Sequence, residues 1–387
     1  MTTTDIQKFG VDSRIAGGRL TINLDALVAN YSVLRKQSGS AKCAAVVKAN
    51  AYGLGAEQVV PALWNAGCDT FFVAVPEEGF AIKRIHPKAI VYVLNGIHEA
   101  SVASVAEGGL VPVLASLEQI ELWADYWKRH GSRRPCAIQV DTGMNRIGLS
   151  LEEALAFRAR NMNEHIVTPM LIMSHLACAD EPSHPLNALQ LESFQLVAKT
   201  FDDIDSSLCN SAGLFMGPDY RFDVTRPGIA LYGGEAVNGT PTALQHVVTV
   251  EARIAQVRKV KMGETVSYGA KHTLEHDAKI ATVSVGYADG YPRAGSSAGV
   301  ALRNTLPTGA HGFIAGKKVP LLGRMTMDLC MFDVTGVADE DLSGGWIELI
   351  GENILLDDAA RAAGTIGYEV LTSLGQRYER IYLSSEL

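Results

Sequence analysis

Residues 44–55, Ala-Ala-Val-Val-Lys-Ala-Asn-Ala-Tyr-Gly-Leu-Gly, combine an apolar run, a single lysine and a glycine-rich loop. The apolar run ending at Val47 predicts a parallel strand covered on both faces, since Val and Ala suit such strands. Gly53 and Gly55 allow a sharp turn and a close approach of backbone to a ligand. Lys48 follows the strand at its C-terminal end, where barrel enzymes keep their chemistry. Apolar neighbours would lower its pKa and make its amine a usable nucleophile or base. The same residues also fit an ordinary surface lysine that ends a strand.

The composition is typical of a soluble globular enzyme. The chain has 387 residues, with 47% hydrophobic and 20% charged residues, enough for two or three domains or one barrel with an appendage. A net charge of -8 and the lack of a basic run argue against a nucleic-acid partner. No apolar stretch approaches the ~20 residues that a membrane span needs. The polar N-terminus has no apolar signal core, so we expect a cytoplasmic protein with residues 1–17 as a candidate disordered lead.

The cysteines and histidines give no sign of a metal site. None of the six cysteines forms a C-x-x-C pair, and most lie in apolar runs, which indicates buried free thiols. The ten histidines include no H-E-x-x-H group. We therefore expect no bound metal.

Strand and helix patterns alternate through the first 230 or so residues. Predicted strands are 19–22, 43–47, 71–75, 89–94, 111–114, 136–140, 167–174, 207–208 and 222–225. Predicted helices include one capped by Asn23, then 56–66, 101–107, 117–130, 151–160 and 187–201. About eight such alternations predict a (β/α)8 barrel. The alternative is a doubly wound sheet, but no G-x-G-x-x-G follows the first strand.

The pattern changes near residue 247. Short β-branched runs follow at 248–260, 280–285, 298–302, 318–322, 329–334 and 346–350, separated by turn residues. Turn residues also cluster in 234–246 and indicate the boundary. The chain thus divides into a barrel, 1–246, and an all-β domain, 247–387.

Polar residues repeatedly follow predicted barrel strands. They are Lys48, Arg146, His175, Asn210 with Ser211, and Arg226. Each alone is more simply explained as structural. Because strands of a parallel barrel end at the same face, the five positions together predict one converging site.

The segment V-V-K-A-N-A-Y-G-L-G resembles the cofactor-lysine signature of alanine racemases, which are fold-type III enzymes that use pyridoxal 5′-phosphate (PLP). The resemblance implies that Lys48 binds the cofactor covalently and that Tyr52 contacts its phosphate. Leu54 stands where the family usually has His. Similar motifs run in order from about residue 19 to residue 385, nearly the whole chain.

Further barrel motifs supply roles by the same resemblance. Residues 141–148 are similar to D-T-G-M-x-R-x-G, which implies that Arg146 contacts the cofactor phenolic oxygen and the substrate carboxylate. Ser174-His175 resembles a motif whose imidazole lies against the pyridine ring. Asn210-Ser211-Ala212 resembles the phosphate-binding N-S-A.

Residues 226–233 match R-P-G-I-x-L-Y-G. The match implies that Arg226 hydrogen-bonds the pyridine nitrogen and that the amides of Gly228 and Ile229 hold phosphate. Arginine only donates hydrogen bonds and stays protonated, so the pyridine nitrogen would have to accept. PLP would then be a weaker electron sink than with an aspartate partner, which disfavours side reactions such as transamination.

A racemase needs a second base on the opposite face of the substrate. Val266-Ser267-Tyr268-Gly269 resembles the family's S-Y-G, which implies that Tyr268 is that base; by itself it would pass for a surface strand tyrosine. Residues 286–291 and 323–328 resemble G-Y-A-D-G and G-R-x-x-M-D, which implies that Tyr287 and Met327 line the substrate site. In the family these three positions reach the other subunit's site, so a head-to-tail homodimer is implied.

Some positions depart from the family pattern. Gln139 stands where many relatives have a carbamylated lysine, and we hypothesise that its amide positions Arg146 instead. Gln376 replaces a tyrosine that holds the second base in many relatives, and Tyr378 is a candidate substitute. Thr326 replaces a common Cys.

The resemblance therefore implies a two-base alanine racemase that interconverts L- and D-alanine, either to supply D-alanine for peptidoglycan or to supply L-alanine for catabolism. One rival is a racemase of broader amino-acid specificity. A second is a fold-type III decarboxylase, which would lack the paired R-P-G-I-x-L-Y-G and S-Y-G motifs. A third is a non-catalytic PLP carrier, which would lack the C-terminal domain.

Overall fold

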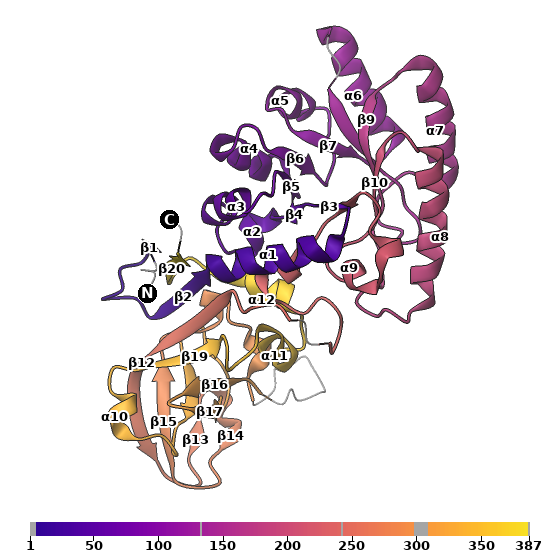
Figure 1. The fold of residues 1–387 in the computed structure, drawn as a ribbon. Coiled ribbons are helices and arrows are strands. Elements are labelled where there is room, and N and C mark those ends of the chain that lie inside the picture. Colours follow the sequence, from indigo (N-terminus) through magenta and orange to yellow (C-terminus); the bar gives the residue numbers. More distant parts are fainter. Residues whose placement is uncertain (1–4, 132–133, 241–242, 298–308, 386–387) are drawn as a thin grey trace. The chain divides into compact units, whose positions relative to one another are not determined.

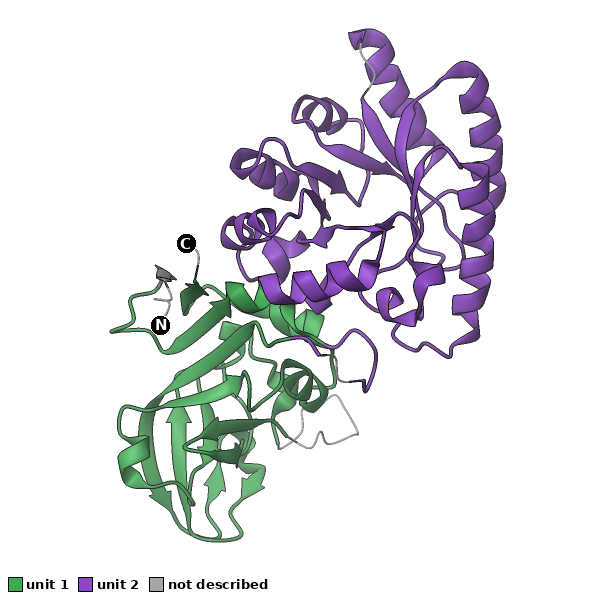
Figure 2. Cartoon of the chain, in the orientation of Figure 1, with its two compact units in different colours: residues 1–27, 232–234, 245–387 green, residues 28–231, 235–244 purple. Residues whose placement is uncertain are grey.

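The computed structural model describes residues 5–131, 134–240, 243–297 and 309–385. The chain forms two compact units, coloured separately in Figure 2. Unit 2 comprises residues 28–231 and 235–244, and unit 1 comprises residues 1–27, 232–234 and 245–387.

Unit 2 is built on a parallel sheet whose strands follow the chain order. The strands are β4 (Ala45–Val46), β5 (Thr70–Val73), β6 (Ile90–Val93), β7 (Val111–Leu114), β8 (Pro135–Gln139), β9 (Thr168–Met173) and β10 (Asp205–Ser207). Helices alternate with them on the outside of the curled sheet (Figure 1), namely α3 (Ala56–Asn65), α4 (Pro76–Ile85), α5 (Val102–Glu107), α6 (Leu117–His130), α7 (Leu151–Glu164) and α8 (Pro185–Thr200). Strands β5 and β7 are buried along their whole length, as expected for strands covered on both faces.

A last strand closes this sheet into a barrel. Strand β11 (Val224–Thr225) pairs in parallel with β3 (Lys42–Cys43), which lies just before β4. On the other side, the amide of Asp223 donates to the carbonyl of Ser206 at 3.0 Å. The predicted (β/α)8 barrel is confirmed, and it also contains α4, a helix that is absent from the sequence-based expectation.

Unit 1 is mostly strand. Its larger sheet contains β1 (Asp5–Gly10), β2 (Gly18–Asn23), β12 (Val248–Val260), β15 (Ala278–Val283), β16 (His311–Ile314), β17 (Lys317–Pro320), β18 (Cys330–Asp333), β19 (Trp346–Ile350) and β20 (Tyr378–Ser384). A separate ribbon joins β13 (Thr265–Val266) to β14 (His272–Thr273). The unit also has short helices, α10 (Asp339–Leu342), α11 (Leu356–Ala362) and α12 (Gly367–Ser373), so it is mostly rather than wholly β.

The N-terminal segment belongs to unit 1 rather than to the barrel. Strand β2 lies between β12, to which it is antiparallel, and β20, to which it is parallel. Within the candidate disordered lead, residues 5–10 form β1, which pairs with β20. Strands β1 and β2 therefore belong to this sheet because their pairing partners, β12 and β20, lie in the C-terminal part of the chain.

Several local expectations are met. Helix α1 (Leu24–Ser38) begins after Asn23, whose Oδ1 accepts a hydrogen bond from the amide of Ala26 at 2.9 Å. All six cysteines are free; Cys178 is half-buried and the others are buried. The predicted strand at 298–302 lies outside the described residues. No helix in the described ranges is long and apolar enough to span a membrane.

Candidate functional site

Lys48 stands at the start of α2 (Lys48–Tyr52), a turn with a left-handed backbone. The φ angles of Ala49, Asn50, Ala51 and Tyr52 are 53°, 55°, 54° and 55°. None of these residues is glycine, and each left-handed residue costs roughly 1–2 kcal/mol. Such strain persists only where surrounding contacts determine the backbone, and it is concentrated at functional sites.

Side-chain oxygens hold this turn at both ends. Glu78 Oε1 accepts a hydrogen bond from the amide of Ala49 at 2.6 Å. Asn50 Oδ1 accepts from the amide of Ala56 at 2.8 Å, at the first residue of α3. Lys48 and Tyr52 thus lie on a turn that is hydrogen-bonded to the two following helices, α3 and α4.

Tyr52, Ser211 and Gly228 converge on one spot. The amide of Gly228 donates to Ser211 Oγ at 2.7 Å. A Cβ at Gly228 would overlap the hydroxyl of Tyr52, so only glycine permits this approach. A hydroxyl donor, a second hydroxyl and backbone N–H groups gathered in this way suit a phosphate group. The neighbouring Asn210 uses its Oδ1 to accept from the amide of Gly213 at 2.9 Å, and Ile229 is fully buried.

Arg226 is a buried cation without a carboxylate partner among the described residues. Its side chain donates to Ser207 Oγ, to the carbonyl of Ser174 at 2.7 Å and to that of Leu208 at 3.2 Å. Burial lowers its pKa to about 10, which leaves it charged at neutral pH. An unneutralised buried charge is costly for folding alone and points to a functional role.

His175 is held as a neutral imidazole. Its Nδ1 lies 3.3 Å from Arg226 Nη2. Because arginine can only donate, Nδ1 must accept, and the ring proton lies on Nε2. Burial, followed by the positive charges of Arg226, Arg146 and Lys48, lowers the pKa of His175 to about 3. Lys48, Arg146, His175 and Arg226 follow four different strands, β4, β8, β9 and β11, which end at the same rim of the barrel.

The surroundings of Lys48 favour its neutral amine form. Burial, followed by the charge of Arg146, lowers its pKa, and Glu78 opposes that shift. A lysine with a lowered pKa keeps a larger fraction of the nucleophilic amine at neutral pH.

A closed loop carries Arg146. Asp141 Oδ1 accepts from the amides of Gly143 at 2.8 Å and Met144 at 2.9 Å, and Val140 bridges to Leu149 where the loop returns. Arg146 is exposed at the loop tip.

Gln190, fully buried on α8, ties this loop to His175. Its Nε2 donates to the carbonyl of His175 at 2.9 Å and to Thr142 Oγ1 at 3.3 Å. Thr142 is also hydrogen-bonded to Ser174 at 2.8 Å. Gln190 therefore fixes the loop of Arg146 relative to the segment that carries the imidazole.

Tyr268, Tyr287 and Met327 lie on three adjoining segments of unit 1. Ser267 Oγ donates to the carbonyl of Arg324 at 2.5 Å, which joins the first segment to the third. The amides of Tyr287 and Ala288 donate to the carbonyls of Thr326 and Met327 at 3.1 and 2.9 Å, which joins the second to the third. All three side chains are exposed, by 71%, 40% and 53% respectively.

The two glutamines that depart from the family pattern have different settings. Gln139 is buried, and its Nε2 points to the carbonyl of Val140 at 3.4 Å; no hydrogen bond joins it to Arg146 within the described residues. The hypothesis that its amide positions Arg146 thus gains no support from the geometry. Gln376 is exposed, whereas Tyr378 is only 1% exposed and belongs to the core of unit 1. Tyr378 therefore does not take the exposed place of position 376.

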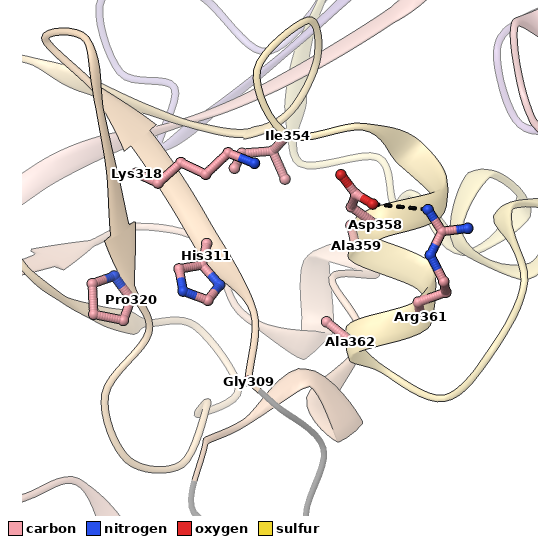
Figure 3. Close-up of a pocket in the computed structure, with 9 residues that line it drawn as sticks. All are labelled: Gly309, His311, Lys318, Pro320, Ile354, Asp358, Ala359, Arg361 and Ala362. Atoms are coloured by element: carbon pink, nitrogen blue, oxygen red, sulfur yellow. Dashed lines mark hydrogen bonds and ion pairs between the residues drawn. The ribbon is translucent and has the colours of Figure 1, made fainter. Parts of the chain in front are cut away.

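A surface cavity of about 600 Å³ lies elsewhere in unit 1 (Figure 3). His311 and Lys318 line one side, and the ion pair of Arg361 and Asp358, at 2.8 Å, lines the other. None of the residues predicted for the site lines it. Over the described ranges, no group of three or more His, Cys, Asp or Glu side chains could hold a metal ion.

Two residues of the rim were not identified from the sequence, Glu78 and Gln190. Glu78 is the third residue of α4, and its position after Pro76 is a recognisable helix-start pattern. Gln190 lies inside a helix and carries no local signal, since its partners come from loops distant in sequence.

Family comparisons agree with this geometry in both parts of the chain. The alanine racemase N-terminal domain family matches residues 22–236, and the alanine racemase C-terminal domain family matches residues 247–382. The chain belongs to the alanine racemase family. Alanine racemase from Rhizobium meliloti is 50% identical over 369 residues, covering 95% of this chain and 97% of that protein. The biosynthetic alanine racemase of Agrobacterium fabrum is also 50% identical, over 95% of this chain and 94% of its own.

A solved structure extends the likeness to three dimensions. Alanine racemase from Bartonella henselae, with covalently bound pyridoxal phosphate, superposes with a TM-score of 0.87 at 38% identity. The match covers 95% of this chain and 99% of that one. The family membership inferred from the sequence motifs is thus confirmed.

Proposed function

We propose that this chain is a PLP-dependent alanine racemase that interconverts L- and D-alanine. The observation that carries the proposal is the single rim on which Lys48, His175 and Arg226 meet, in a chain of this family. The two relatives compared above are alanine racemases, and this chain matches them over 97% and 94% of their length.

The residues at the rim fit PLP. Ser211, Tyr52 and the backbone at Gly228 would hold its phosphate, because the Gly228 amide lies 2.7 Å from Ser211 Oγ and the lack of a Cβ at Gly228 lets the Tyr52 hydroxyl approach. Arg226 would donate to the pyridine nitrogen, and neutral His175 would lie against the ring. When bound, the cofactor withdraws electrons from the substrate α-carbon and so acidifies its proton.

Lys48 is the proposed acid/base on one face of the substrate. Its lowered pKa makes the neutral amine available to take the α-proton, and its ammonium can return one. Arg146, exposed at its loop tip, presents a planar fork of donors suited to bind the substrate carboxylate. Arg226 limits electron withdrawal because it cannot give up its proton to the pyridine nitrogen.

Tyr268 is the proposed base for the opposite face, supplied by the other subunit of a homodimer. Support comes from the exposure of Tyr268, Tyr287 and Met327 on adjoining segments, since exposed tyrosine and methionine side chains are enriched at protein interfaces. A symmetric dimer would then have two composite sites, each with Lys48 from one subunit and Tyr268 from its partner.

Hybrid dimers test this arrangement. Lys48→Ala and Tyr268→Phe subunits, each inactive alone, are unfolded together and refolded as a mixture. A hybrid dimer would contain one intact site and one doubly altered site, so the mixture should regain roughly a quarter of the wild-type rate. Sites built within single subunits would regain nothing.

The same proposal covers role and location. A cytoplasmic enzyme would supply D-alanine for peptidoglycan or L-alanine for catabolism. Two measurements distinguish this activity from its rivals. Racemisation of serine or lysine at rates near that of alanine would indicate a racemase of broader specificity. Release of carbon dioxide would indicate a decarboxylase.

A further inference from the structure

We infer that Glu78 is a positioning residue for Lys48, because its carboxylate joins the left-handed turn after the lysine to the loop after the neighbouring strand. The inference rests on the proposed role of Lys48. Glu78 lies on α4, outside the motifs that carry the family resemblance.

The two carboxylate oxygens of Glu78 bind different strand ends. Oε1 accepts from the amide of Ala49 at 2.6 Å, immediately after Lys48. Oε2 accepts from the amide of Ala74 at 2.8 Å, immediately after β5, and from that of Val75 at 3.4 Å. Strands β4 and β5 are paired neighbours, so the side chain of Glu78 connects the segments that follow two adjacent strands.

The turn needs such a contact. Its left-handed residues follow Lys48 directly, and Ala49 and Asn50 are exposed, so apolar packing cannot hold them. The amide of Ala49 has Glu78 as its acceptor. Backbone hydrogen bonds within the turn, such as that from the amide of Gly53 to the carbonyl of Ala49 at 2.7 Å, also support it. Without Glu78, however, the start of the turn would lose its connection to the end of β5, and we expect Lys48 and Tyr52 to lose their common orientation.

A carboxylate is the chemical group required at this point. It accepts at both oxygens, whereas an amide accepts at one end and donates at the other. A glutamine would therefore set an N–H donor against the amide of either Ala49 or Ala74. A shorter aspartate could not reach both amides.

Glu78 also supplies negative charge to the lysine. Arg146, from the loop after β8, adds to the burial that lowers the pKa of Lys48, while Glu78 raises it. His175, after β9, is neutral, and Arg226, after β11, is cationic. Glu78 is thus the one carboxylate acting on Lys48 among the groups identified around it in the described chain.

Glu78→Gln tests the inference, with Glu77→Gln as its matched control. Glu77 is exposed on the same helix, and its change removes the same charge without touching the turn. Amide hydrogen exchange on the full-length protein should show about tenfold faster exchange in the peptides spanning 48–53 or 72–76 in Glu78→Gln only. This readout does not depend on any reaction.

A second measurement detects the effect of the negative charge of Glu78. In PLP-loaded protein, the pH midpoint of the cofactor's absorbance change should fall by roughly half a unit in Glu78→Gln and stay unchanged in Glu77→Gln. Glu78→Asp is too short to reach both amides, so it should lose exchange protection. Because it keeps the negative charge, its pH midpoint should stay close to that of the wild type. If Glu78→Gln does not fold, Glu78→Asp decides the question by the same exchange measurement.

The outcomes separate this inference from the proposed function. Identical exchange in the Glu78 and Glu77 variants would overturn the positioning role, whatever the enzyme does. A wild-type protein that binds no PLP would instead overturn the proposed function, and the exchange result would still stand.

Discussion

Arg377 binds Asp289 through two parallel hydrogen bonds, from Nε to Oδ1 at 2.6 Å and from Nη2 to Oδ2 at 2.8 Å. Its remaining Nη1 donates to Asp328 at 2.8 Å. Asp289 follows Tyr287 by two residues, and Asp328 follows Met327 directly. One arginine therefore fixes both loops that carry the exposed side chains of unit 1.

Replacing Arg377 with Gln should destabilise the fold. The Asp289 side chain is only 6% exposed, so the change leaves a buried carboxylate without its cation, at a cost of about 2–3 kcal/mol. Urea unfolding measures the loss. Arg361→Gln is the matched control, because its pair with Asp358 lies at the surface and should cost less than about 1 kcal/mol. Equal losses in the two variants would show that Arg377 has no special role.

His175 should make the protein lose stability in mild acid. Its pKa falls from 6.5 to about 3 on folding, so the unfolded chain takes up the proton first as the pH decreases. The native state is therefore penalised progressively from about pH 6.5 down to about pH 3, by roughly 2 kcal/mol at pH 5. Urea unfolding at a series of pH values measures this slope.

His175→Gln removes that titration and should flatten the slope, whatever its effect at neutral pH. His98→Gln, at an exposed histidine, serves as the control and should keep the wild-type slope. An unchanged slope in His175→Gln would mean that His175 is not held neutral in the native protein.

Gly228→Ala should weaken cofactor binding without unfolding the protein. The added Cβ overlaps the Tyr52 hydroxyl, so the tyrosine must move away from the phosphate position. We expect roughly tenfold weaker PLP binding, measured by absorbance titration, and a similar loss in Tyr52→Phe. Gly336→Ala is the control, since its Cβ would meet only Lys317 Nζ at 3.8 Å. Normal affinity in Gly228→Ala would rule out this phosphate site.

Tyr268→Phe should reduce racemisation by about 100-fold or more while leaving the fold and PLP binding intact. The side chain is largely exposed within unit 1, so removing its hydroxyl has little structural cost. In deuterium oxide, α-proton exchange should persist from one enantiomer and be lost from the other, because Lys48 still serves its own face. Exchange from both enantiomers at wild-type rates would exclude Tyr268 as a base.

The sequence was sufficient to predict the barrel because its strands are continuous apolar runs and its helices alternate with them. The segment 117–130 is a helix with the bounds expected of it. The predicted strand 19–22 is present as β2, but β1 and the place of both strands in unit 1 were not predicted, because their partners lie more than 200 residues away. Pairing over such distances leaves no local pattern in the chain.

The site shows the same limit. Motifs predicted Lys48, His175 and Arg226, and the structure brings them to one rim. Glu78 and Gln190 could not be predicted from sequence motifs, because their role is to bind backbone groups of loops that are separate in the sequence. The left-handed turn after Lys48 was also unexpected, since its residues, Ala-Asn-Ala-Tyr, include no glycine.

The most direct test of the account is chiral analysis of the product formed from L-alanine by the PLP-loaded protein, with Lys48→Ala as the control. We predict that D-alanine appears until the two enantiomers reach a ratio close to one, because they have equal free energies in water, and that Lys48→Ala forms none. A wild-type protein that binds PLP through Lys48 but leaves L-alanine unchanged would contradict the proposed function.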